Sequence, residues 1–125
     1  MPFQVVKEYE IAAAHYLPDH PSKCRHVHGH NYKIRLTLGA ERLDEHGMVL
    51  DFGVLKGMLD DLLGPLDHQV INDHPPFDAL APTAEHLAEW VGREIGRRLE
   101  NDHDRVSVAR VEVWETDRSA AVWLP

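Results

Sequence analysis

The chain has 125 residues, of which 43% are hydrophobic, and its formal net charge is −8. This length is most simply one domain spanning residues 1–125. The acidic balance, with no basic stripe, argues against nucleic-acid binding. No apolar stretch approaches the roughly 20 residues of a membrane span, no signal-peptide core opens the sequence, and a single cysteine excludes an intrachain disulfide. We therefore expect a soluble cytoplasmic protein without nucleic-acid or membrane partners.

Two runs of alternating apolar and polar residues come first, and each predicts a half-buried antiparallel strand. One face of the first run carries Phe3, Val5, Tyr9, Ile11, Ala13 and His15. One face of the second carries His28, His30, Tyr32, Ile34, Leu36 and Leu38. Three histidines therefore lie on the apolar faces, beside the loop 16–27 that joins the two runs.

Two helices and a hairpin are expected next. Asp51 is a candidate N-cap for a helix that carries Phe52, Leu55, Leu59 and Leu62 and ends at Gly64-Pro65. After a proline-rich loop over 73–82, Thr83 caps a second helix with the apolar stripe Ala84, Leu87, Ala88, Val91, Ile95 and Leu99. Residues 106–115 and 120–123 predict a closing hairpin. The resulting α+β order is ββααββ, and the free edges of such a sheet favour oligomerisation.

The triplet His28-Gly29-His30 is the strongest chemical signal. Side chains at i and i+2 of a strand share a face, so both histidines can bind one ion, and an antiparallel neighbour would add His15. Three imidazoles with an open fourth position are typical of catalytic zinc. Two plainer explanations are a chance pair in a chain with ten histidines, and looser binding of several ions that also uses His20 and His26.

Cys24, the only cysteine, allows three interpretations. The residue could fill space in the apolar core (a buried filler), bind the metal as a fourth ligand, or act as a reactive thiolate. A loop position between Lys23 and Arg25 disfavours the filler, because neighbouring cations lower the pKa of a thiol. Direct ligation would close the metal site to substrate, so we favour a general base.

Two further signals come from carboxylates. Asp67 precedes His68, and a carboxylate beside a histidine can orient its ring for proton transfer, although such dipeptides are common. Glu115 ends a run whose apolar face holds Ala109, Val111 and Val113, with Arg110 and Glu112 on the other face. Such a glutamate either turns to solvent or accepts hydrogen bonds from the neighbouring N–H groups of a bound ring. The sequence alone does not separate these two interpretations.

Taken together, these motifs resemble the 6-pyruvoyl tetrahydropterin synthase family, and most of all its 6-carboxy-5,6,7,8-tetrahydropterin synthase branch of the queuosine pathway. The resemblance covers nearly the whole chain, with one departure at Ile11, where the family usually has an aromatic residue. Its motifs are Ala13-Ala14-His15, Cys24-x-x-x-His28-Gly29-His30-Asn31, Asp51-Phe52, Leu66-Asp67-His68, Pro82-Thr83-Ala84-Glu85 and Glu115-Thr116.

The resemblance implies the tunnelling fold (T-fold), a four-stranded antiparallel sheet with two helices on one face. It also implies homo-oligomers, either trimers whose sheets form a barrel or hexamers made of paired trimers, with active sites between subunits. Both expectations agree with the predicted order of elements and with the need to cover the sheet edges.

Carried over residue by residue, the resemblance makes His15, His28 and His30 the ligands of Zn²⁺ and Cys24 the general base. Asp67 and His68 become its proton-relay partners, and Glu115 anchors the pterin ring. The implied reaction converts 7,8-dihydroneopterin triphosphate to 6-carboxy-5,6,7,8-tetrahydropterin, with release of acetaldehyde and triphosphate.

Two alternative functions are compatible with these residues. A 6-pyruvoyl tetrahydropterin synthase would eliminate triphosphate and keep the side-chain carbons. A non-catalytic zinc-binding scaffold would need only the three histidines. The presence of Cys24, Asp67, His68 and Glu115 disfavours the scaffold, which requires none of them. Candidates for triphosphate binding are Lys23, Arg25 and Arg118.

Overall fold

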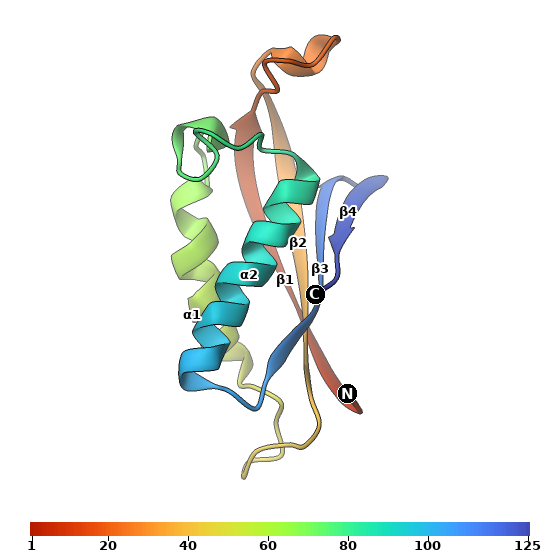
Figure 1. Ribbon diagram of the computed structural model, residues 1–125, viewed down its shortest axis with the longest axis vertical. Coiled ribbons are helices and arrows are strands. Elements are labelled where there is room, and N and C mark those ends of the chain that lie inside the picture. Colours follow the sequence, from red (N-terminus) through yellow and green to blue (C-terminus); the bar gives the residue numbers. More distant parts are fainter.

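The computed structural model describes residues 1–125 and contains one antiparallel sheet with the strand order β1-β2-β3-β4. The strands are β1 (Phe3–His15), β2 (His28–Ala40), β3 (Ser107–Thr116) and β4 (Ser119–Trp123). Between β2 and β3 come α1 (Phe52–Leu63) and α2 (Ala84–Asp102), which lie together on one face of the sheet (Figure 1). Single 3₁₀ turns occupy Lys23–Arg25, Gly64–Leu66 and Ile71–Asp73. The predicted α+β fold and its ββααββ order are confirmed.

Both helices begin at the residues that the sequence predicts. The Asp51 carboxylate accepts hydrogen bonds from the amides of Gly53 and Val54, and the Thr83 hydroxyl accepts one from the amide of His86. These bonds satisfy amides that have no partner within the helix. The placement of Phe52 in the buried stripe is wrong, because its side chain is 52% exposed. Val54 in the same turn is also exposed, so the rest of the chain leaves this turn uncovered.

The core lies between the helices and the inner face of the sheet. It holds 25 buried apolar residues, among them the predicted stripe of α2 and the inward side chains of β2. Strands β1 and β2 pair along their whole length, from Phe3 opposite Ala40 to His15 opposite His28. This register places the predicted metal ligands at one end of the sheet, where the loop 16–27 projects beyond the strands (Figure 1).

The outer face of the sheet is polar but not fully solvated. The alternation in β3 predicts Glu112 on this outer face, and there it is only 7% exposed. The Trp114 indole donates to its carboxylate at 3.0 Å and the Arg110 guanidinium at 3.1 Å. A carboxylate with such donors can be buried at little cost, and the side chains that supply them cover it.

The two outer strands differ in how their free edges are covered. Near its C-terminal end, β1 bonds to the segment 67–70: the amide of His68 donates to the carbonyl of Ala12, and the amide of Ala14 to the carbonyl of Gln69. The outer edge of β4 and the first half of β1 pair with no strand of the chain. Neither helix has the length and apolar character needed to cross a membrane.

Candidate metal centre and active site

The ends of β1 and β2 bring three histidines together. His15 lies directly opposite His28, and His30 lies opposite Ala13 on the same face. One ring nitrogen of each histidine lies within 4.8 Å of the other two. His20 and His26, the additional ligands of the looser alternative, are not part of this group.

Two of the three imidazoles are oriented by backbone carbonyls. Nδ1 of His15 donates to the carbonyl of Pro82 at 2.7 Å, and Nδ1 of His28 donates to the carbonyl of His26 at 2.7 Å. A proton on Nδ1 leaves the lone pair of Nε2 free, which is the tautomer that a metal-binding histidine needs. These carbonyls could not be identified from the sequence, because any residue supplies one.

The third imidazole has a buried nitrogen without a partner. Nε2 of His30 makes no hydrogen bond, and the carboxylate of Glu115 is 3.9 Å from it. An unpaired buried nitrogen is unfavourable unless a cation or another donor meets it. Tetrahedral zinc bound at about 2.0–2.1 Å needs nitrogens about 3.4 Å apart, so small ring rotations would complete the site. The three neutral imidazoles therefore fit Zn²⁺.

Burial also makes the stability of the metal-free protein depend on pH. It lowers the pKa of the His15 imidazole below its ordinary value of 6.5, against the opposing effects of the Pro82 carbonyl and the Glu115 charge. The unfolded chain therefore binds more protons than the folded chain, so stability rises with pH in this range. We expect the free energy of unfolding to be largest above pH 6.5 and to fall as the pH drops below it.

Chemical denaturation of the metal-free protein at pH 7.5 and 5.5 measures this effect. The aspartates with lowered pKa, such as Asp67, titrate below their ordinary value of 3.8 and so contribute little in this window. A His15→Gln variant should lose much of the dependence, whereas a variant of the exposed His46 should keep it. Equal dependence in both variants would contradict the assignment to His15.

The histidines border a hollow of about 410 Å³, a volume that suits a small organic ligand. Its other lining residues are Leu17, Lys23, Cys24 and Glu115. Cys24 lies on the 3₁₀ turn of the loop and is partly exposed. Its sulfur is not part of the ligand group formed by the histidines. The structure therefore places a free thiol beside the candidate metal position and not in it.

Glu115 continues the inward face of Val111 and Val113 and lies at an irregularity in the hairpin. On β3, Trp114 pairs with Ala120 and Thr116 pairs with Ser119, so Glu115 is an extra residue between two pairs. Such a bulge frees a side chain from the regular pleat and can aim it at a binding site. The Glu115 side chain is 28% exposed and faces the histidines, not open solvent.

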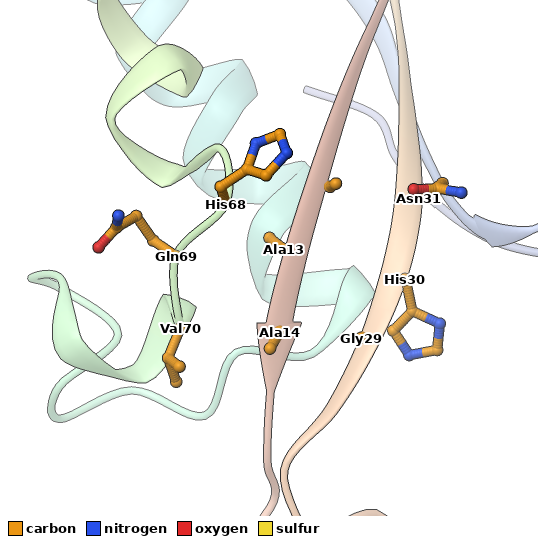
Figure 2. Close-up of a pocket in the computed structure, with 9 residues that line it drawn as sticks. Ala13, Ala14, Gly29, His30, Asn31, His68, Gln69 and Val70 are labelled. Carbon is orange, nitrogen blue, oxygen red and sulfur yellow. The ribbon is translucent and has the colours of Figure 1, made fainter.

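The predicted proton-relay residues, Asp67 and His68, do not line the hollow that contains Cys24. Asp67 accepts a hydrogen bond from the amide of Ala12 at 2.9 Å, which lowers the pKa of its carboxyl, and its other oxygen is 3.1 Å from Nδ1 of His68. The His68 ring is 80% exposed and borders a second hollow of about 410 Å³ along β1, which His30 also lines but Cys24 does not. Figure 2 shows β1 between His68 and His30. Within one chain, Glu115 and Cys24 share a hollow with all three histidines, whereas His68 shares a hollow only with His30.

The fold and this site can now be compared with known proteins. Residues 4–124 match the family model described as 6-pyruvoyl tetrahydropterin synthase. The chain belongs to this family.

Two similar relatives are named 6-carboxy-5,6,7,8-tetrahydropterin synthase. The protein from Synechocystis sp. is 38% identical over 122 residues, which cover 94% of this chain and 89% of the relative. The protein from Bacillus subtilis is 31% identical over 128 residues, which cover 98% of this chain and 86% of the relative.

A solved structure confirms the fold. The 6-pyruvoyl tetrahydropterin synthase of Caenorhabditis elegans superposes with a TM-score of 0.84 at 23% identity, over 98% of this chain and 95% of that one. The tunnelling fold that the sequence resemblance implies is therefore correct.

Proposed function

We propose that the chain is a zinc-dependent lyase that converts 7,8-dihydroneopterin triphosphate and one water to 6-carboxy-5,6,7,8-tetrahydropterin, acetaldehyde and triphosphate. One observation carries this proposal: a single hollow is lined by three convergent histidines, a free thiol and a carboxylate. The relatives from Synechocystis sp. and Bacillus subtilis, which carry the name of this activity, support the choice of product.

Each residue of the hollow has a chemical task in this proposal. His15, His28 and His30 hold Zn²⁺, which as a Lewis acid would polarise side-chain oxygens of the substrate and acidify the neighbouring C–H groups. The Glu115 carboxylate accepts hydrogen bonds from adjacent N–H groups of the pterin ring and so fixes the ring beside the histidines. Sγ of Cys24 accepts the proton that leaves a C–H group of the substrate side chain. A base of this kind needs a reduced thiol, which favours a cytoplasmic location.

Asp67 and His68 would take part from a neighbouring subunit. His68 and Cys24 line different hollows of one chain, and His30 is the one residue that borders both. The sheet also has unpaired edges at β1 and β4 that a second copy can extend. We therefore propose a trimer or hexamer in which His68 of one subunit, oriented by Asp67, exchanges a proton with Cys24 of the next.

An assay of products tests the proposed reaction. We expect the zinc-loaded protein to turn 7,8-dihydroneopterin triphosphate into a carboxypterin, acetaldehyde and triphosphate in equal amounts, as identified by mass. A pyruvoyl product would instead indicate a 6-pyruvoyl tetrahydropterin synthase. Unchanged substrate in the presence of bound zinc would indicate a non-catalytic scaffold. The metal-free protein serves as the control and should release no product.

A further inference from the structure

The three histidines differ in how their rings are held. Backbone carbonyls fix His15 and His28 through Nδ1, but the buried Nε2 of His30 has no hydrogen-bond partner. A metal-binding histidine usually has such a bond on its second nitrogen, because it sets the tautomer and the direction of the ring. Another interaction must therefore hold the His30 imidazole.

Aromatic packing supplies that interaction. Three rings lie edge-on to His30: His15 at 5.0 Å, His28 at 5.0 Å and Tyr32 at 5.3 Å between centroids. His15 and His28 are themselves proposed ligands, so their ring positions would depend on the metal. Tyr32 is the only ring of the three that belongs to the protein core, where it is fully buried.

The same tyrosine also touches His15. Its ring lies 5.8 Å from that of His15 at an interplanar angle of 89°, and 5.3 Å from that of His30 at 68°. Edge-to-face contacts of this kind are directional, so a rigid ring between two imidazoles restricts how each can turn. Tyr32 does not line the hollow of the site and therefore does not contact a ligand there.

We propose that Tyr32 is a positioning residue of the metal centre, whose buried ring aims the imidazole of His30, and to a lesser degree that of His15, at the metal. The proposal rests on the zinc site of the proposed function. It assigns to an aromatic ring the role that carbonyls play for the other ligands.

The ring carries this role, and the hydroxyl does not. The Tyr32 hydroxyl is buried and has no hydrogen-bond partner, so it neither anchors the ring nor joins a chain of donors to the histidines. A buried hydroxyl without a partner is unfavourable. Removing it while keeping the ring should therefore leave zinc binding intact.

The zinc affinity of full-chain variants shows whether the ring or the hydroxyl of Tyr32 matters for metal binding. We expect Tyr32→Phe to bind zinc within about twofold of the unmodified chain, as measured by competition with a chromophoric chelator. We expect Tyr32→Met, which fills a similar volume with a flexible chain, to weaken binding about 10-fold or more, the range found for groups that orient metal ligands. Tyr32→Leu provides a second ring-free variant in case the methionine variant does not fold.

Two further measurements exclude a general loss of packing. Ile34→Ala opens a cavity two residues along the same strand face, where Ile34 is fully buried, and should leave zinc affinity within about threefold although it destabilises the fold. In the metal-free protein, the imidazole NMR signals of His30 should report averaging between ring orientations in Tyr32→Met but not in Tyr32→Phe.

The outcomes are distinct. Unchanged zinc affinity in both ring-free variants, or equal loss in Tyr32→Phe, Tyr32→Met and Ile34→Ala, overturns the role of the Tyr32 ring while the zinc site stands. Failure of the unmodified chain to bind one zinc ion overturns the proposed metal centre itself.

Discussion

Replacing Cys24 with alanine is expected to leave one zinc ion bound per chain while lowering turnover by about 10²–10⁴-fold, the usual contribution of a general base. The reason is geometric. The sulfur borders the same hollow as His15, His28 and His30, but it stands outside the group of atoms that can share one ion. Metal content by mass spectrometry and steady-state turnover of 7,8-dihydroneopterin triphosphate measure the two quantities separately.

Two control variants show how loss of a ligand and a neutral change in the loop affect zinc content and turnover. His28→Ala removes a ligand and should lose both zinc and turnover. Ser22→Ala changes the exposed residue that precedes the same 3₁₀ turn, and Ser22 does not line the hollow, so this variant should keep zinc and most of the activity. Loss of zinc from Cys24→Ala would make the thiol a ligand and contradict its assignment as the base.

Much of the framework follows from local pattern. The alternation in β1 and β2 has period two, so it fixes which side chains face inward, and the register observed then brings His15 opposite His28. The caps of the helices are equally local, because Asp51 and Thr83 bind amides only two or three residues away. Each of these predictions depends on neighbours in the sequence, and each is confirmed.

The features that sequence reasoning missed depend on contacts between distant segments. The bulge at Glu115 arises from the pairing of β3 with β4, and no single residue type signals it. The carbonyl of Pro82 meets His15 across 67 positions of the chain. Tyr32 was placed correctly on the inner face as one more apolar residue, yet its packing against two histidines follows only from the geometry of the site.

The position of His68 shows a different limit. Its backbone has a φ of +60°, a conformation that side chains rarely adopt, and it directs the ring away from the core at the β1 edge. Adjacency in sequence does not by itself bring the side chains of His68 and Asp67 together, but in the structure they lie 3.1 Å apart. Nor does adjacency predict that His68 lines a different hollow from Cys24.

Because Cys24 and His68 line different hollows of one chain, we expect variants of the two residues to complement each other across subunits. Cys24→Ala and His68→Ala should each be nearly inactive alone, yet subunits of the two variants should restore activity when they assemble together. In a mixed oligomer, the His68→Ala subunit supplies an intact Cys24 and the Cys24→Ala subunit supplies an intact His68. With equal amounts and random assembly, about a quarter of all sites recover both residues, and in a mixed ring of three subunits one site of the three does. Co-expression with two different affinity tags, followed by purification on both, isolates the mixed oligomers for turnover assays.

A second mixture provides the control, because it distinguishes the two hollows. Cys24 and Glu115 line the same hollow of one chain, so a mixture of Cys24→Ala with Glu115→Gln leaves every such hollow damaged and should recover no activity. Recovery of activity in the Cys24–His68 mixture but not in this control would therefore show that each active site lies between subunits. Cys24 would come from one subunit, and His68, at the β1 edge, from the next. Absence of recovery in doubly tagged, correctly assembled oligomers would mean that each chain works alone. In that case, loop 16–27 would have to move before Cys24 could exchange a proton with His68 of its own chain.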